Sequence, residues 1–215
     1  DKGTVRLILN NASISNTTTA PIKVLDAKKV ILTLADNTTN TITDSSRLST
    51  EEDYSAAIYS KEDLIINGNG TLNVNAGYRN GIKSTDDCII VSGTLNITST
   101  EDGIIGKDLC GVVAGDININ AGSDGIKSTY DTDTTKGNVI IEGGNITIKA
   151  SNDGIQAENI LVINDGTINI KTNNGAADTT QTHTDNMYMG RGGFGFNNNK
   201  TTTTTDDTVE SRKGN

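Results

Sequence analysis

The chain has 215 residues, of which 33% are apolar, and its aromatic side chains are five tyrosines and two phenylalanines, without any tryptophan. Its formal net charge of −9 disfavours nucleic acid as a partner, because phosphate binding requires a basic face, and it suits divalent cations or simple solubility. No apolar run approaches the ~20 residues of a membrane span.

The chain begins at Asp1 without a methionine, so we expect a processed or trimmed chain whose export signal is not seen. Its first part contains two strand-like segments, "TVRLILNNASISN" and "AKKVILTLADNTTNTIT". These segments are less regular than the sequence that follows them. We therefore expect residues 1–55 to form irregular turns that cap the N-terminal end of the fold.

The middle of the chain repeats three phrases in a fixed order. One is Asp or Asn followed by Gly and an apolar residue, the second is Gly followed by alternating apolar and polar residues, and the third is an apolar run before each of these glycines. The first phrase begins at Asn80, Asp102, Asp124, Asp153 and Asn174, and the glycines of the second are Gly70, Gly93, Gly115, Gly144 and Gly166. Steps of 23, 22, 29 and 22 residues separate these glycines, so the period is about 22 residues.

Each period predicts three short strands. In "GTLNVNA", the apolar residues Leu72 and Val74 fall on one face and Asn73 and Asn75 on the other, which is the two-residue period of a strand. Three strands per turn predict an all-β fold, a parallel β-helix (solenoid) whose turns stack at ~4.8 Å around Ile, Val and Leu. The longest step has seven extra residues, which we place in a corner loop at 130–138.

The two cysteines fall at equivalent positions of the repeat. Cys88 and Cys110 each lie five residues before the glycine of their turn, so we expect them in one ladder of adjacent turns. They are either two small buried apolar residues or a disulfide, because neighbouring turns lie within the Cα separation that a disulfide accepts.

The 22-residue repeat ends near residue 175. Residues 1–175 are the predicted solenoid, and residues 176–215 are a Gly-, Asn- and Thr-rich excursion with a C-terminal segment. His183, the one histidine of the chain, lies in this excursion, where we expect it to be solvated.

Acidic residues recur at the corners between strands. Asp102, Asp124 and Asp153 are expected to form a column of carboxylates ~5 Å apart, which repel one another unless their pKa values rise or a cation lies among them. Hard oxygen ligands select Ca²⁺, and the sequence has no thiolate–imidazole set for zinc. The alternative is that these residues only shape the corners by bonding local N–H groups.

A second acidic set follows the Gly-Ile strands and comprises Asp63, Asp86, Asp87, Asp108, Asp131 and Asp133. From the two sets together, the predicted calcium ligands are Asp102, Asp124, Asp153, Glu101, Asn80, Asn152, Asp86, Asp87, Asp108 and Asp131.

The stretch "DGIKST…KGNVIIEGGNITIKASNDGIQAENILVINDGTINI" closely resembles the repeats of the clostridial carbohydrate-binding β-helix proteins. The opening "LILNNASIS…API…AKKVILTLADNTTNTIT" and the segment "MYMGRGGFGF" are similar to that family as well. The resemblance implies a secreted, calcium-containing, right-handed β-helix, similar in shape to pectate lyases, that binds cellulose or pectic acid. In the family a further phrase opens more turns, whereas here "ESRKGN" stops at Asn215, so we expect the stack to be cut short.

The resemblance favours an extracellular or cell-surface, non-catalytic protein whose partner is a polysaccharide. The expected carbohydrate contacts are Lys83 and Lys127, with Tyr59 in register with them and Tyr78 and Tyr130 at or near corners. One alternative is a polysaccharide lyase, in which a lysine would be the base beside a uronate neutralised by metal. Another is a structural subunit, because an uncapped β-helix end can be completed by the next copy in a head-to-tail filament.

Overall fold

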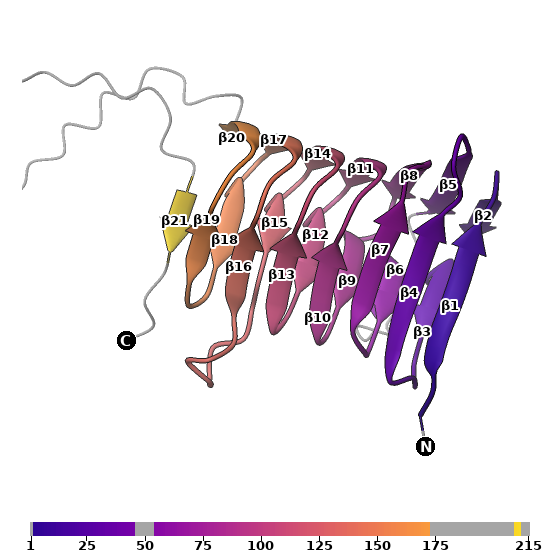
Figure 1. Cartoon of the computed structure of the whole chain (residues 1–215), viewed down its shortest axis with the longest axis horizontal. Coiled ribbons are helices and arrows are strands. Elements are labelled where there is room, and N and C mark those ends of the chain that lie inside the picture. Colours follow the sequence, from indigo (N-terminus) through magenta and orange to yellow (C-terminus); the bar gives the residue numbers. More distant parts are fainter. Residues whose placement is uncertain (1, 46–53, 173–208, 212–215) are drawn as a thin grey trace, which may run out of the picture.

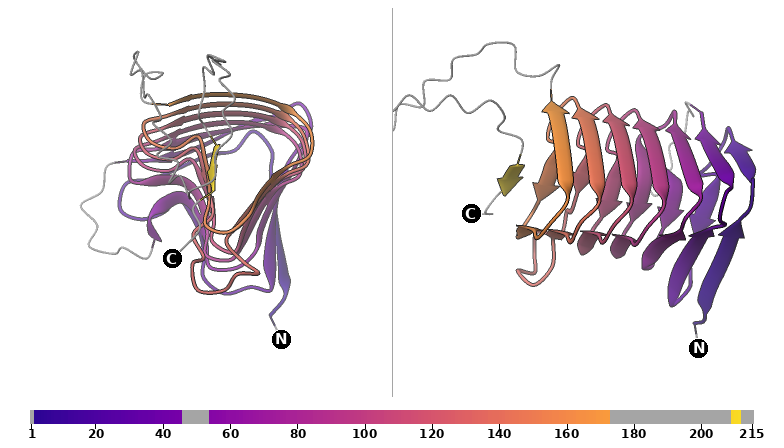
Figure 2. Two further views of the ribbon diagram at one scale, coloured as in Figure 1. Left: turned by 90° about the vertical axis from the view of Figure 1, so that its left-hand side faces the viewer. Right: turned by 45° about the horizontal axis from the view of Figure 1, so that its top comes forward.

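The computed structural model describes residues 2–45, 54–172 and 209–211, and this part of the chain winds into seven turns of a parallel β-helix (Figure 1). Each turn contributes one strand to each of three parallel seven-stranded sheets, which we call A, B and C in the order in which the chain enters them. Seen along the axis, the three sheets enclose a single core (Figure 2). The predicted all-β solenoid with three strands per turn is confirmed.

Sheet A contains β1 (Thr4–Leu9), β4 (Lys29–Leu34), β7 (Leu64–Gly68), β10 (Asp87–Ile90), β13 (Leu109–Val112), β16 (Asn138–Ile141) and β19 (Leu161–Ile163). Sheet B contains β2 (Ser13–Asn16), β5 (Thr39–Asp44), β8 (Thr71–Ala76), β11 (Thr94–Ser99), β14 (Asp116–Ala121), β17 (Asn145–Ala150) and β20 (Thr167–Thr172). Sheet C contains β3 (Ile22–Val24), β6 (Ala56–Ser60), β9 (Asn80–Ser84), β12 (Ile104–Gly106), β15 (Ile126–Lys127), β18 (Ile155–Ala157) and β21 (Val209–Ser211).

The core is a set of apolar columns that run along the axis. In sheet B, Leu72 is the register partner of Leu95, which in turn pairs with Ile117, and all three side chains are fully buried. The intervening Asn73 pairs with Asn96 on the outer face. Because every turn places the same kind of residue at the same position, Ile, Leu and Val fill the interior without aromatic side chains.

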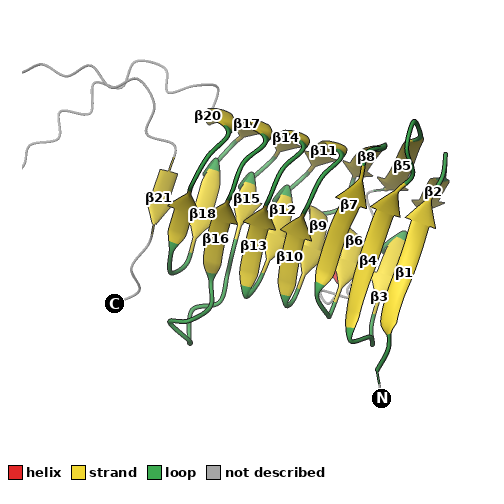
Figure 3. Ribbon diagram, in the orientation of Figure 1, coloured by secondary structure: helices red, strands yellow, loops and turns green. Residues whose placement is uncertain are grey.

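Glycine makes the corner between sheets A and B. Gly115 has a φ of +114°, which favours glycine, and a Cβ there would lie 2.7 Å from the carbonyl oxygen of Gly93. Gly93, Gly144 and Gly166, which precede β11, β17 and β20, have positive φ as well, whereas before β8 the positive φ falls on Gly68. Short loops join most of the consecutive strands, and the loop between β15 and β16 is longer (Figure 3).

The corner loop at 130–138 and the cysteine ladder are both found as predicted. The inserted residues lie between β15 and β16, and the loop projects below the stack in Figure 1. Cys88 and Cys110 are register partners on β10 and β13, where both are fully buried free thiols. Burial raises the pKa of both thiols, that of Cys110 to about 12, so they behave as apolar core residues and not as reactive groups.

The described residues of the first 55 contribute strands to the same three sheets, but their turns are longer and less even than the later ones. Val5 pairs with Val30, 25 residues on, and Val30 with Leu64, 34 residues on, whereas Cys88 pairs with Cys110, 22 residues on. At the other end, β21 pairs with β18 through Val209 and Ile155, so the chain returns to sheet C within the segment 176–215. Asn174 and His183 lie outside the described residues. Within the described part of the chain, no helix is long and apolar enough to cross a membrane.

Candidate functional site

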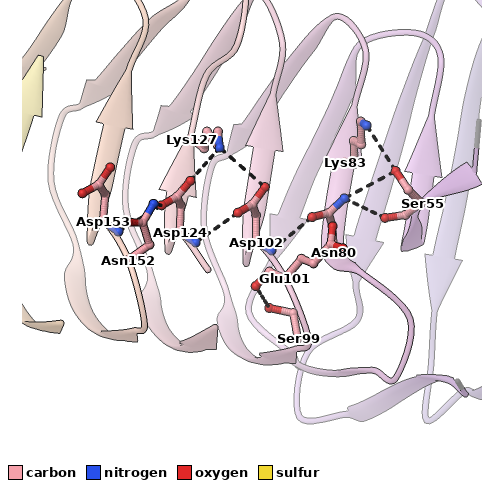
Figure 4. A network of polar contacts seen from close by, with 10 residues as sticks. All are labelled: Ser55, Asn80, Lys83, Ser99, Glu101, Asp102, Asp124, Lys127, Asn152 and Asp153. Carbon is pink, nitrogen blue, oxygen red and sulfur yellow. Dashed lines mark hydrogen bonds and ion pairs between the residues drawn. The ribbon is translucent and has the colours of Figure 1, made fainter. Parts of the chain in front are cut away.

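The repeated Asp/Asn-Gly-Ile phrase forms a hydrogen-bonded polar column at the corner between sheets B and C (Figure 4). The backbone N–H of Asp102 donates to Asn80 Oδ1 (3.1 Å), that of Asp124 to Asp102 Oδ1 (3.0 Å) and that of Asp153 to Asp124 Oδ1 (2.9 Å). At the start of the column, Asn80 Nδ2 donates to the carbonyl oxygen of Ser55 (2.7 Å). The side chains of Asn80, Asp102 and Asp124 therefore each satisfy a backbone group of a neighbouring turn, as the corner-forming alternative requires.

The glycine of the phrase allows the turns to approach. A Cβ on Gly103 would lie 2.5 Å from both the carbonyl oxygen of Gly125 and the Cγ2 atom of Ile119. The N–H of Gly103 meanwhile donates to the carbonyl oxygen of Asp124 (2.8 Å). The apolar residue that follows glycine points into the core, so the phrase links the polar column to the interior.

Lys127 supplies the positive charge of this column. Its ammonium lies 2.6 Å from Asp124 Oδ2 and 3.9 Å from Asp102 Oδ2, while Asn152 Nδ2 donates to Asp124 Oδ1 (2.6 Å). Burial raises the pKa of Asp124, but the bonds from Lys127 and from the Asp153 amide outweigh it, so the pKa is lowered. Burial likewise works against the charged form of Lys127, yet Asp124 and the neighbouring carboxylates raise its pKa.

The negative charge of the column is thus compensated by Lys127, where the sequence predicts a bound metal cation. Among the described residues, the carboxylates of Asp102, Asp124 and Asp153 do not form a group whose oxygens all lie within the reach of one ion. Glu101 is exposed and lies 3.9 Å from Arg79, and Asn152 is taken up by Asp124. The physical reason is that each Oδ1 atom points at the N–H of the next turn instead of at the next carboxylate.

A second acidic group lies at the corner between sheets C and A. Cys88 pairs with Leu64, and Asp87 pairs with Leu109. This register sets Asp63 beside Asp87, and Asp86 beside Asp108, in three consecutive turns. One carboxylate oxygen each from Asp63, Asp86 and Asp87 lie within 4.8 Å of one another.

The electrostatics of this acidic corner differ from those of the column. Burial raises the pKa of Asp86 to about 6, with further contributions from a hydrogen bond to Asp108 and from repulsion by Asp63. Burial and the same neighbours raise the pKa of Asp87. Among the described residues, Asp63, Asp86 and Asp87 are the acidic, histidine or cysteine side chains that lie close enough together for three of them to bind one metal ion. Three carboxylates fit a hard cation, since they supply about half of the six to eight oxygens that Ca²⁺ takes.

Tyr130 and two lysines flank the acidic corner. The ammonium groups of Lys107 and Lys136 lie 4.8 and 4.9 Å from the centre of the Tyr130 ring. Lys136 also forms an ion pair with Asp108, which is bonded to Asp86. Tyr130 and Lys136 of the inserted loop, together with Lys107 of the preceding turn, therefore form a cationic and aromatic surface at the edge of the carboxylate group.

The remaining predicted contacts are scattered. Tyr59 is the register partner of Lys83, as expected, but only 3% of it is exposed, because it packs on Ala20 and Ala56 and meets Tyr54 edge to face. It cannot offer its ring to a sugar. Tyr78 lies beside Arg79 at the corner between sheets B and C, Lys83 donates to Ser55, and Asp131 is exposed in the inserted loop.

A polar groove at the corner between sheets A and B was missed in the sequence. It is open and is lined by Gly115, Asp116, Gly143, Gly144, Asn145, Asp165, Gly166 and Thr167. The glycines leave the notch, and Asn145 bonds to Asp116 across it (2.8 Å). The sequence carries a signal for this groove, because each of these polar residues adjoins a glycine of the repeat.

The chain matches a family model described as "Carbohydrate-binding domain-containing protein" over residues 1–214. A curated protein of the same description from Acetivibrio thermocellus is 39% identical over 95 residues, which are 42% of this chain and 33% of that protein. The chain thus spans about a third of that relative. The solved structure of a polysaccharide lyase-like protein from C. thermocellum, a gadolinium derivative, matches with a TM-score of 0.77 and 35% identity over 79% of this chain and 70% of the other.

Proposed function

The chain belongs to the carbohydrate-binding domain-containing family, and we propose that it is a non-catalytic, extracellular protein that binds an acidic polysaccharide through Ca²⁺. The observation that carries the proposal is the carboxylate group of Asp63, Asp86 and Asp87 beside Tyr130 and its lysines. Polysaccharides of plant or microbial walls lie outside the cell, so this ligand implies an extracellular site of action.

The acidic corner would hold Ca²⁺ through Asp63, Asp86 and Asp87, with Asp108 beside them. A bound divalent cation offsets their mutual repulsion and supplies positive charge at the surface, where a carboxylate or hydroxyl of a sugar can approach.

The glycan would be an acidic one because of the groups that flank the cation. Lys107 and Lys136 add two positive charges within 5 Å of the Tyr130 ring. Cationic side chains recognise carboxylates by charge-assisted hydrogen bonds, and an aromatic ring adds apolar area for the face of a sugar. A neutral glucan would gain nothing from the two lysines.

A non-catalytic role is supported by the state of the lysines that a lyase mechanism would use. A general base must be deprotonated at the working pH, and the pKa of Lys127 is raised because Asp124 and Asp102 stabilise its charged form. Lys83 donates to Ser55 in the corresponding position two turns away. Incubation with polygalacturonate should therefore give no unsaturated product by ultraviolet absorbance, and a steady rise that needs Lys127 would refute the non-catalytic role.

The binding proposal is tested by affinity electrophoresis in gels that contain polygalacturonate. We expect retardation with Ca²⁺ and loss of retardation with EDTA. The double variant Asp86→Asn with Asp87→Asn should fold, because it removes repulsion, but should not be retarded. Asp133→Asn is the control, since Asp133 only caps the inserted loop through Thr135. Equal mobility of all proteins with and without the glycan would refute the proposal.

A further inference from the structure

The outer face of sheet B differs in composition from the rest of the chain. In β5, β8 and β11 the three side chains of each strand that point away from the core are all Thr or Asn. The next strand, β14, continues the pattern with Asn118 and Asn120 and adds one charge, Asp116. The whole chain is 21% charged, so a face with so little charge is matched to an uncharged ligand and not to an ionic one.

This face lies on the side of the stack, within internal turns. The strands β8, β11 and β14 each have a described strand of sheet B on both sides. Asn75, Thr98, Asn118 and Asn120 are exposed. Sheet B runs along the top of the stack in Figure 1, and no described segment lies over it in Figure 2. Its exposure therefore does not depend on where the stack begins or ends.

The asparagines in the middle of this face form an amide ladder, which consists of Asn73, Asn96 and Asn118. Nδ2 of Asn96 donates to Oδ1 of Asn73 (2.9 Å), and Nδ2 of Asn118 donates to Oδ1 of Asn96 (3.0 Å). The three residues are register partners in successive turns, so the ladder repeats at the strand spacing of about 4.8 Å.

The amide ladder is ordered before any ligand binds. A side-chain amide has two N–H groups and an oxygen with two lone pairs. The ladder uses one N–H and one lone pair of Asn96, and so it leaves a second donor and a second acceptor for a ligand. Because the side chains are already fixed by one another, a ligand costs them little further rotamer entropy.

An acetamido group has the chemistry that this ladder can recognise. Its amide is trans, so its N–H and its C=O lie at opposite ends, and amides joined end to end repeat at the same spacing of about 4.8 Å as in a β-sheet. One acetamido group can thus accept from the N–H of one asparagine and donate to the oxygen of the next. Thr71 and Thr94 lie one column away in the same strands and offer methyl and hydroxyl groups to the rest of the sugar.

We propose that the outer face of sheet B binds an uncharged polysaccharide that carries acetamido groups, with the amide ladder as its central contact. This ligand differs from the acidic polysaccharide proposed for the acidic corner, and its binding needs no Ca²⁺. The acidic corner lies between sheets C and A, so the two sites use different residues and can be disabled separately.

Cosedimentation of the full chain with insoluble chitin, which carries acetamido groups, tests the proposal. We expect binding that persists in EDTA and that is weaker on cellulose, which has hydroxyl groups but no acetamido groups. Asn96→Val should weaken binding to chitin roughly tenfold, because it removes the middle amide of the ladder and keeps a residue that suits a strand. The matched control is Asn67→Val, since Asn67 is also a half-buried asparagine on an outer face, that of sheet A, where it accepts a hydrogen bond from Thr33. Circular dichroism and thermal melts show whether each variant retains its fold.

The double variant Asp86→Asn with Asp87→Asn separates this site from the acidic corner. It should bind chitin like the native chain, whereas Asn96→Val should keep the calcium-dependent retardation by polygalacturonate. The proposal is overturned if the native chain does not sediment with chitin, or if it binds cellulose equally well, which would mean that hydroxyl groups alone are recognised. An equal loss in Asn67→Val, or a loss of chitin binding in the double aspartate variant, also overturns it.

Discussion

Lys127 donates a hydrogen bond of 2.6 Å to Oδ2 of Asp124, a side chain that is only 1% exposed. The same ammonium lies 3.9 Å from Asp102 in the preceding turn. A lysine of the chain thus takes the place that a bound cation would otherwise have in the carboxylate column. The column is consequently a structural element of the corner between sheets B and C. The candidate cation site lies at the corner between sheets C and A.

Replacement of Lys127 by Met should destabilise the fold by about 3 kcal/mol, because it leaves the buried carboxylate of Asp124 without its partner. Urea unfolding measures this change. The control is Lys149→Met, since Lys149 is an exposed lysine on the outer face of sheet B. An equal loss of unfolding free energy in the two variants would show that the ion pair between Lys127 and Asp124 does not stabilise the fold.

The pH dependence of stability should show the lowered pKa of Asp124. A carboxylate whose pKa is lower in the folded than in the unfolded state stabilises the fold above its ordinary value of 3.8, and this contribution is lost as the pH falls through the folded pKa. Asp124→Asn has no such group. The difference in unfolding free energy between the native chain and this variant should therefore shrink from about pH 6 to about pH 2.

That comparison is specific because the other acidic residues remain in both proteins. Asp102 and Asp153 also lie near Lys127, and both are present in the native chain and in the variant. A difference that stays constant over the whole acid range would contradict the assignment of the buried charge to Asp124.

Much of the fold was readable from the repeat. The spacing of the glycines predicted the length of one turn, and the two-residue alternation predicted which side chains face the core. The seven extra residues in one step predicted the inserted loop. The return of the chain to sheet C at β21 could not be read, because "VES" is too short to carry a pattern and follows a long segment without any.

The site was less predictable, because it depends on where side chains point. The sequence placed Asp102, Asp124 and Asp153 in one column, but repetition alone does not say whether an Oδ1 atom meets an N–H group or a carboxylate. Tyr59 alternates as an outward residue and is nevertheless buried, since Tyr54 and Ala20 cover it. The acidic corner required the register of Cys88 with Leu64, which sets Asp63 against Asp87.

Calcium should stabilise the chain through the acidic corner. An ion that binds only the folded state at 100 times its Kd adds about 2.7 kcal/mol, which corresponds to a rise in Tm of roughly 5–10 °C for a chain of this size. A thermal melt with Ca²⁺ and with EDTA measures the shift. Asp87→Asn should abolish it and Asp124→Asn should not, and an unchanged melt of metal-free protein would remove calcium from the proposal.

Tyr130→Ala should weaken polysaccharide binding roughly tenfold without a loss of calcium binding. The ring holds Lys107 and Lys136 at the edge of the acidic corner, so its removal disperses both positive charges. The control is Tyr78→Ala, since Tyr78 stands beside Arg79 at a different corner. If Tyr78→Ala weakens binding more than Tyr130→Ala does, the glycan contacts the corner between sheets B and C instead.

The close approach of turns at the polar column makes its glycines sensitive to a single methyl group. A Cβ on Gly103 meets the carbonyl oxygen of Gly125 and the side chain of Ile119 at 2.5 Å, and the first of these is backbone that cannot move without shifting a turn. Gly103→Ala should therefore cost about 3 kcal/mol of unfolding free energy, the upper part of the range for overpacking.

Gly111 is the matched control, because it lies in the next turn and its Cβ would meet only Ile89, at 3.5 Å or more. Gly111→Ala should be neutral or stabilising by up to about 1 kcal/mol, since it restricts the unfolded chain. Urea unfolding of both variants measures the difference. If Gly103→Ala is as stable as Gly111→Ala, the turns are not packed as closely as the hydrogen bond from Gly103 to Asp124 requires.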